Sequence, residues 1–484
     1  MTEINNQTYR QTKIIATIGP STSSEEVIRG LIDAGVDLVR LNFSHADSET
    51  HKKRAELVRK ISEELHYHIG IVGDLQGPKI RIGKFENSKI DLKNGGKFTI
   101  DSNYSLEEGN EEIVGTSYTD LTNDIKTGDT LLLDDGRIEL LVEKVKDSQV
   151  CTKIISGGLL YSSKGMNKKG GGLSAPAIGD KDRNDIKLAA EIDVDYLAVS
   201  FAKEAKDIEQ ARELINKAGC NASIIAKIER AEAIENIDSI IEASDAVMIA
   251  RGDLGVEIGD AQLPAIQKEL INKARKNNKA VITATQMMES MITNSVPTRA
   301  EVFDVANAVL DGTDAVMLSS ETAMGDHPVE AVNAMSRICV GSEKENPITK
   351  KQTSFIAPCS TIDKAIALAC MQTSENLNVK AIAALTESGS TALWMSRRNH
   401  IIPIFAITTH IHTLRKVTLY KGVYPAHLKT IDKEHAQVNR DVISTLESLN
   451  VVQKEDLVII TKGDLAGMQG GTNALKIVKV GYLV

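Results

Sequence analysis

The stretch VMIARGDLGVEIG, residues 247–259, begins as an apolar run and then changes abruptly to Arg251, Gly252 and Asp253. An apolar run without polar alternation is typical of a strand that is covered on both faces, as in a parallel sheet. The abrupt change predicts that the core ends here. The charged residues are then expected to reach the edge of the sheet, where the loops lie.

Seven further runs of the same kind occur along the chain. They are TKIIATIG from Thr12, VDLVRLNF from Val36, HIGIVGDL from His68, DYLAVSF from Asp195, SIIAKIE from Ser223, AVITATQ from Ala280 and AVMLSS from Ala315. The segments between them, such as SEEVIRGLIDAG, carry apolar residues at helical spacing. Strand–helix alternation repeated about eight times predicts an α/β fold, the (β/α)8 barrel of the TIM type.

Two further regions predict additional domains. A long insertion follows the third run, and its segments KFTI, TLLLDDGRIELLVEKV and VCTKII predict a small β-barrel that forms a lid over the barrel mouth. Near the C-terminus, VKAIAALT, IPIFAIT, KGVYPAHL and DLVIITKG predict an α/β domain with an open parallel sheet. The expected boundaries are 1–75 with 175–345 for the barrel, 76–174 for the lid and 346–484 for a C-terminal regulatory domain.

Composition excludes several classes of protein. The chain has 57 Lys and Arg against 66 Asp and Glu, which disfavours a nucleic acid or an anionic membrane as partner. No apolar window approaches the roughly 20 residues that a membrane span needs, and the first residues lack a signal-peptide core. The five cysteines lack C-x-x-C pairing, which argues against a disulfide framework or a zinc site. We therefore expect a cytoplasmic protein.

The active site of such a barrel lies at the carboxyl ends of its strands. The residues expected there are Arg40, Asn42, Ser44, Asp74, Ser200, Phe201, Lys227, Glu229, Arg251, Asp253, Thr285, Gln286, Ser319 and Glu321. Lys227 and Glu229 are two residues apart on one strand and should face the same side. Glu229 and Asp253 end neighbouring strands, so their carboxylates suit a Mg²⁺ ion that keeps its other positions for water and substrate. This arrangement suits a transferring phosphoryl group or an enolate.

Each feature also has a purely structural interpretation. Taken singly, these are rim ion pairs for Lys227 with Glu229 and for Arg40, a tight turn for residues 251–255, backbone-bonded hydroxyls for Thr285 and Ser319, and a loop hydrogen bond for His45. Backbone N–H groups at Gly252 and Asp253 can instead receive a carboxylate or phosphate. The convergence of acids, cations and hydroxyls at successive strand ends favours a functional site.

A series of longer motifs follows in chain order. They are TIGP at Thr17, RLNFSH at Arg40, GDLQGPKIRIG at Gly73, LLDDGRIE at Leu132, KGMN at Lys164, IIAKIE at Ile224, ARGDLGVE at Ala250, TATQMMESM at Thr283 and PTRAEVFDVANAVLDGTDAVMLSSETA from Pro297. Together they resemble the pyruvate kinase family along essentially the whole chain. The resemblance implies phosphoryl transfer from phosphoenolpyruvate to ADP, giving pyruvate and ATP, with Mg²⁺ or Mn²⁺ as cofactor. It also implies a homotetramer.

The resemblance implies roles for the residues at the strand ends. Glu229 and Asp253 would hold the Mg²⁺, and Lys227 with Arg40 would neutralise charge on the phosphoryl group and the enolate oxygen. The amides of Gly252 and Asp253 would receive the substrate carboxylate. The proton relay to the enolpyruvate carbon would involve Thr285, Ser319 and Glu321. The nucleotide would meet four residues, namely Arg81, Lys164, Asn42 and His45.

One position departs from the pattern of potassium-requiring members. The family commonly binds K⁺ beside the phosphoryl site, and the matching positions here are Asn42, Ser44, Asp74 and Leu75. In members that require potassium, the residue before Ile-Arg in G-P-x-I-R is Glu, whereas here it is Lys79. A fixed ammonium group can supply the charge that K⁺ supplies elsewhere, so we expect activity without added K⁺.

The C-terminal segment TESGSTALWMSRR suits a phosphate cradle at the start of a helix. Its candidate residues are Ser388, Gly389, Ser390 and Thr391. By itself this segment is equally consistent with a left-handed turn and a helix cap. The resemblance implies an allosteric effector site, with Arg397 or Arg398 and the glycines near Gly470 as further contacts. Glu387 would repel a second phosphate, so we expect a monophosphorylated effector.

Two other functions remain compatible with the residues alone. The first is a different metal-dependent barrel enzyme that stabilises an enolate, against which the nucleotide-facing lid argues. The second is a catalytically silent metabolite sensor on the same scaffold. The presence of Lys227, Glu229, Asp253 and Arg40 argues against the second.

Overall fold

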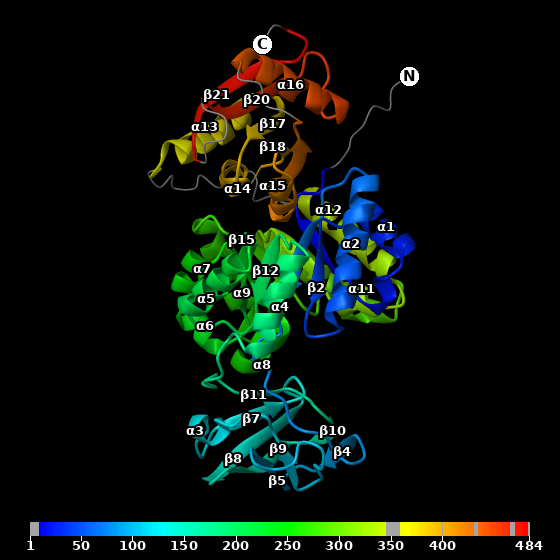
Figure 1. Ribbon diagram of the computed structural model, residues 1–484, viewed down its shortest axis with the longest axis vertical. Helices are drawn as coiled ribbons and strands as arrows, with labels where there is room; N and C mark the ends of the chain where they lie inside the picture. The colour runs from blue at the N-terminus through cyan, green and yellow to red at the C-terminus, as the bar shows by residue number, and fades with distance from the viewer. Residues whose placement is uncertain (1–8, 345–358, 399, 430–433, 465–469, 483–484) are drawn as a thin grey trace.

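The computed structural model describes residues 9–344, 359–398, 400–429, 434–464 and 470–482. Three bodies follow one another along its long axis (Figure 1). The α/β barrel lies in the middle, the domain inserted after β3 lies at one end, and the C-terminal domain lies at the other.

Eight parallel strands close into a barrel in the order β1-β16-β15-β14-β13-β12-β3-β2, which confirms the predicted TIM fold. The strands are β1 (Lys13–Thr17), β2 (Leu38–Asn42), β3 (Gly70–Asp74), β12 (Tyr196–Val199), β13 (Ser223–Ile228), β14 (Ala246–Ala250), β15 (Ala280–Ala284) and β16 (Ala315–Leu318). Alternate residues of each strand serve two cores. Ile225, for example, packs with the barrel interior, whereas Ile224 packs against the outer helices. This double burial explains the continuous apolar runs.

Helices surround this barrel and cover the outward faces of its strands (Figure 1). They are α1 (Glu25–Asp33), α2 (Ser48–Glu64), α4 (Asp180–Glu191), α5 (Ala205–Lys217), α6 (Ala231–Glu235), α7 (Ile237–Ala243), α8 (Arg251–Ile258), α9 (Leu263–Lys276), α10 (Arg299–Asp311), α11 (Ser320–Ala323) and α12 (Pro328–Lys344), with short 3-10 turns η1 (Pro20–Thr22) and η2 (Glu289–Ile292). Because α8 and α11 begin directly at the carboxyl ends of β14 and β16, their first turns line the barrel mouth.

The inserted domain is a curled β-structure, as predicted. Its elements are β4 (Lys89–Leu92), β5 (Lys97–Asp101), β6 (Ile113–Gly115), α3 (Leu121–Asp124), β7 (Thr130–Leu133), β8 (Ile138–Lys146), β9 (Gln149–Ser156), β10 (Gly158–Tyr161) and β11 (Met166–Lys168). Six strands form one sheet in the order β11-β7-β8-β9-β5-β6, and β10 pairs with β4. Arg81 bridges to Gly165 beside one edge strand and Ile82 bridges to Thr116 beside the other, so a single irregular segment closes the sheet.

The C-terminal domain contains one strand that the sequence did not reveal. Its elements are α13 (Ile362–Asn376), β17 (Val379–Leu385), α14 (Ser390–Ser396), β18 (Ile404–Thr408), α15 (Ile411–Lys416), η4 (Val417–Leu419), β19 (Val423–His427), α16 (His435–Ser448), β20 (Leu457–Gly463) and β21 (Thr472–Lys479). The sheet order is β19-β18-β17-β20-β21, and β21 is antiparallel to β20. The four predicted strands are parallel, which confirms the expected open parallel sheet, and β21 adds an antiparallel edge strand to it. As an edge strand with partly exposed residues, β21 lacks the continuous apolar run that marks a central parallel strand.

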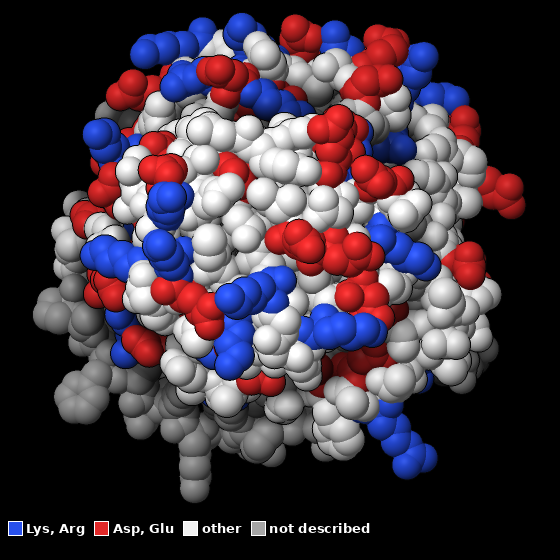
Figure 2. Space-filling view, turned by 90° about the horizontal axis from the view of Figure 1, so that it is seen from below, with Lys and Arg blue, Asp and Glu red and all other residues white. Residues whose placement is uncertain are grey.

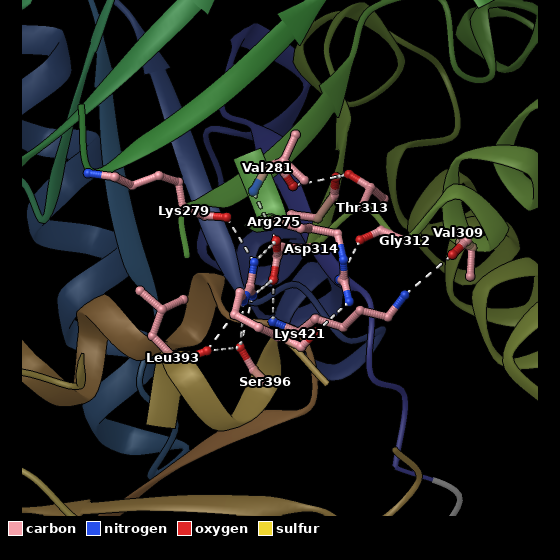
Figure 3. A network of polar contacts seen from close by, with 12 residues as sticks. Arg275, Lys279, Val281, Val309, Gly312, Thr313, Asp314, Leu393, Ser396 and Lys421 are labelled. Carbon is pink, nitrogen blue, oxygen red and sulfur yellow. Dashed lines mark hydrogen bonds and ion pairs between the residues drawn. The ribbon is translucent and has the colours of Figure 1, made fainter. Parts of the chain in front are cut away.

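A buried polar network joins the base of the barrel to this domain (Figure 3). The fully buried Asp314 accepts hydrogen bonds from Arg397 (2.9 Å) and from the backbone N–H groups of Val281 (2.9 Å) and Lys421 (3.0 Å). Burial, together with the charge of Arg275, lowers the pKa of Lys421 to about 8. Arg397 was expected near the effector, but it follows the last residue of α14 and points into this junction, at the opposite end of the helix from the cradle.

The surface at the lid end carries no continuous charge of one sign. Seen from that end, basic and acidic side chains alternate with uncharged surface (Figure 2). Among the described residues, no helix combines the length and apolar character that crossing a bilayer requires.

Candidate active site

A buried cluster of two cations and two carboxylates lies at the carboxyl ends of β2, β3 and β13. Lys227 Nζ lies 2.9 Å from Glu229 Oε1 and 3.2 Å from Asp74 Oδ1, and Arg40 Nε donates to Asp74 Oδ2 at 2.6 Å. The Asp74 and Glu229 side chains are 1% and 2% exposed, so these are not the solvated ion pairs of a barrel rim. Asp74 thus holds two cations side by side, a role that the sequence did not suggest.

Burial and neighbouring charges set the protonation of this cluster. Burial raises the pKa of Glu229, the negative charges of Asp253 and Asp74 raise it further, and Lys227 opposes them. Burial lowers the pKa of Lys227, but Asp74 and Glu229 outweigh it, so that pKa is raised overall. Lys227 therefore remains cationic, whereas the Glu229 carboxylate lies near other negative charges that repel it.

The two predicted metal ligands fit a divalent cation. Glu229 directly follows β13, Asp253 lies in the first turn of α8 after the neighbouring strand β14, and the charge of Asp253 raises the pKa of Glu229. A cation between them would offset this repulsion, and hard oxygens are the ligands that Mg²⁺ prefers. No group of three or more His, Cys, Asp or Glu suited to a metal occurs among the described residues.

The loop after β15 is strained. Thr285 and Gln286 have φ values of 66° and 53°, a left-handed conformation that costs non-glycine residues about 1–3 kcal/mol each. Thr285 Oγ1 accepts a hydrogen bond from Gly252 N (2.8 Å) and donates to Ala284 O (2.6 Å). The Gly252 amide, expected to receive a substrate carboxylate, is therefore bonded to Thr285 in this structure.

The side chain of Arg251 does not reach the barrel mouth. It is 7% exposed and donates to Thr285 O (2.8 Å) and to Asp304 Oδ1 (2.7 Å). The expectation that this charged strand end projects into the mouth is wrong for Arg251. The side chain folds back beneath the neighbouring loop because the parallel register sets Ala250 beside Ala284, which brings the two following residues together.

Glu321 ties together the loops after β15 and β16. Its buried carboxylate accepts hydrogen bonds from Ser319 N (2.7 Å) and Met288 N (3.2 Å). The structure therefore places Glu321 as a support for these loops, next to Ser319.

Three of the four residues assigned to the nucleotide are His45, Arg81 and Lys164, and the structure shows what surrounds each of them. Burial lowers the pKa of His45, and the charges of Arg81 and Arg40 lower it further. Arg81 donates to Ser163 O at 3.0 Å. Lys164 Nζ lies 2.7 Å from the buried Asp134 of the lid, an ion pair that the LLDDG motif alone does not reveal.

The residues of the expected monovalent-cation site also lie close together. Asn42 pairs in register with Asp74 across β2 and β3, and Asn42 Oδ1 accepts a hydrogen bond from Ser44 N (3.1 Å). Leu75 O accepts a hydrogen bond from Ser200 Oγ (2.7 Å), and Ser200 Oγ in turn accepts one from Lys227 Nζ (2.6 Å). Ser200, which directly follows β12 and was expected among the strand-end residues, therefore links this site to Lys227.

Lys79 lies beside Asp253, one of the two predicted metal ligands. Its Nζ is 3.3 Å from Asp253 Oδ1, and neither side chain is fully buried. The ammonium group that the sequence compared with a K⁺ ion thus meets one of the two carboxylates directly.

The candidate effector segment is partly available to a ligand. Ser388 Oγ and Ser390 Oγ lie 2.8 Å apart beside Gly389, whose φ of 85° requires the left-handed region. Thr391 is buried and its hydroxyl is 3.0 Å from that of Thr472, so it points into the domain.

Comparisons with known proteins identify the relatives of this chain. The family model described as "Pyruvate kinase, barrel domain" matches residues 9–332, and "Pyruvate kinase, alpha/beta domain" matches residues 364–478. A pyruvate kinase of Buchnera aphidicola from Schizaphis graminum is 52% identical over 98% of this chain and 99% of its own. Pyruvate kinase II of Salmonella typhimurium is 50% identical over 97% and 99%. A crystal structure of a pyruvate kinase from Cryptosporidium parvum superposes with a TM-score of 0.90 at 36% identity, covering 97% and 96%.

Proposed function

Because the chain belongs to the pyruvate kinase family, we propose that the cluster around Lys227 is where it transfers the phosphoryl group of phosphoenolpyruvate to ADP. This is the Mg²⁺-dependent last step of glycolysis. The observation that supports the location is the Lys227 ammonium held between two buried carboxylates and next to Arg40. Pyruvate release from phosphoenolpyruvate, with ADP and Mg²⁺ present or withheld, tests it. Release without ADP would instead indicate a different enolate-stabilising enzyme, and no release would indicate a sensor.

The residues at the strand ends have different roles in this reaction. Lys227 and Arg40 neutralise the charge that develops on the phosphoryl group and the enolate oxygen, in a site that excludes water. A Mg²⁺ ion held by Glu229 and Asp253 would polarise the phosphoryl oxygens. The Thr285 hydroxyl lies at the mouth and can hold a proton for the relay to the enolpyruvate carbon.

The supporting residues act on the same reaction. The Gly252 amide receives the substrate carboxylate by exchanging its bond to Thr285, while Ser319 and Glu321 fix the neighbouring loops. Arg81, near the start of the lid segment, and Lys164, near its end, contact the nucleotide phosphates. Asn42 and His45 complete this side of the site.

The enzyme needs no added monovalent cation. Lys79 Nζ lies 3.3 Å from Asp253 and already supplies positive charge beside the metal ligands. We expect turnover to persist when tetramethylammonium replaces K⁺ in a steady-state assay. Lys79→Glu should lower turnover about 10²-fold without K⁺ and should respond to K⁺. Loss of wild-type turnover without K⁺, while substrate still binds, would contradict this proposal.

A phosphorylated effector binds at the segment that contains Ser388, Gly389, Ser390 and Thr391. The paired serine hydroxyls support this assignment, and Glu387, bonded to His410 at 2.5 Å, lies beside them. We expect sugar monophosphates to activate at lower concentration than fructose bisphosphate, because a second phosphate meets Glu387. Activation curves test this preference, and micromolar activation by fructose bisphosphate would refute it. The Ser390→Asp variant should lose activation.

The remaining assignments concern organisation. We propose the domain limits 1–75 with 175–345, 76–174 and 346–484; the last junction falls at residues 345–358, outside the described residues. We also propose a cytoplasmic homotetramer. Light scattering should give the mass of about four 52.5 kDa chains, and cell fractionation should find the chain in the cytoplasm.

A further inference from the structure

We infer that Arg251 is a positioning residue that holds the loop of Thr285 in its left-handed conformation. The inference rests on the proposed function, because Thr285 matters to turnover only if the proton relay lies at this site. It assigns to Arg251 a role that differs from contact with substrate or metal.

The contacts of Arg251 are directed at the strained backbone. Its Nη2 donates to Thr285 O (2.8 Å) and to Gln286 O (3.1 Å), and its Nε lies 3.2 Å from Thr285 O. Its Nη1 donates to Asp304 Oδ1 of α10 at 2.7 Å. One planar guanidinium group therefore binds both carbonyls of the left-handed pair and is itself fixed from a third element.

The loop requires such support. Thr285 and Gln286 are consecutive residues with positive φ, and a β-branched threonine is a clear outlier in that region. Such conformations persist only where the surrounding structure over-determines them. Released from Arg251, the loop is expected to relax toward negative φ, which moves the Thr285 hydroxyl away from Gly252 N.

Register explains why Arg251 is the residue that does this. Ala250 of β14 pairs with Ala284 of β15, so the residues immediately after the two strands are neighbours. Arg251 is also the first residue of α8, and Gly252 and Asp253 follow it. The same short segment thus supplies a metal ligand on one side and the loop support on the other.

The test compares Arg251→Met with Arg251→Lys in the full-length enzyme. Methionine keeps much of the length but removes every donor, and we expect kcat to fall about 10²-fold, since small misplacement of a reacting group has effects of this size. KM for phosphoenolpyruvate should change far less. Lysine keeps one charged contact and should give an intermediate kcat. Exchange of the pyruvate methyl protons with deuterated solvent, followed by NMR, should fall in parallel with kcat.

A rescue variant separates positioning from general damage. Glycine adopts positive φ without strain, and the Gln286 side chain is exposed, so Gln286→Gly relieves the loop at little cost in packing. Added to Arg251→Met, it should restore kcat about tenfold. If Arg251→Met does not fold, as judged by circular dichroism, the same rescue is tested on Arg251→Lys.

Arg212→Met is the matched control. Arg212 likewise donates to a carboxylate, Asp245 (2.8 Å), and to a carbonyl, Ala243 O (2.9 Å), but near the start of β14. Its kcat should stay close to that of the wild type. An Arg251→Met enzyme that matches the control, or a double variant no faster than its parent, overturns the inference. Failure of the wild-type chain itself to make pyruvate from phosphoenolpyruvate and ADP would instead refute the proposed function.

Discussion

Lys227→Met is expected to lower turnover by at least about 10³-fold, because the site loses the one ammonium group buried between Asp74 and Glu229. In a low-dielectric site such a charge stabilises developing negative charge far more than it would in water. The loss should appear in kcat, measured with saturating phosphoenolpyruvate, ADP and Mg²⁺. A Lys227→Met enzyme whose turnover falls by only about tenfold or less would contradict the catalytic role proposed for Lys227.

Folding must be monitored in the same experiment. Removing one partner of a buried ion pair costs about 3–5 kcal/mol, because the remaining charges lose their compensation. Lys227→Arg, which keeps the charge, should fold and still lose much of its activity, since a planar guanidinium group cannot take the place of a compact ammonium group. Lys52→Met is a matched control, since Lys52 pairs with Glu191 at 2.7 Å on the surface. This control should retain wild-type turnover.

Glu229→Gln and Asp253→Asn are expected to weaken Mg²⁺ binding by more than about 10²-fold, because loss of a residue that only supports a metal ligand already costs up to about this much. Each substitution removes one of the two carboxylates that the described residues bring together. Isothermal titration with Mg²⁺, in the absence of substrates, measures this directly. Turnover of both variants should fall with the loss of metal. Affinity within about threefold of the wild type would remove the carboxylate pair from the metal site.

The pH dependence of Mg²⁺ binding should be set by Glu229. Burial, with the charges of Asp253 and Asp74, raises the pKa of Glu229, so a proton competes with Mg²⁺ for this group at higher pH than for an ordinary glutamate. Mg²⁺ affinity should therefore weaken as pH falls. Glu229→Gln should remove most of this dependence. Asp238→Asn, at a carboxylate that is 77% exposed, should leave both the affinity and its pH profile unchanged.

The barrel and its candidate site could be predicted because both depend on short-range patterns. A strand buried on both faces must be apolar throughout, so each of the eight strands could be recognised from its own sequence. The carboxyl ends of parallel strands meet at one mouth, so polar residues at those ends were expected to converge. The β21 strand could not be predicted in this way, because an edge strand is partly exposed and need not be apolar throughout.

The sequence by itself determined which chemical groups stand at the ends of successive strands: the lysine, the carboxylates and the hydroxyls. Only the tertiary structure decided how these groups are paired. In the folded chain Asp74 pairs with both Lys227 and Arg40. Arg251 donates to the carbonyl of Thr285, and Arg397 donates to Asp314. The physical reason is that periodicity fixes the face on which a side chain emerges, whereas its partner depends on strand register and on loops that are distant in the chain.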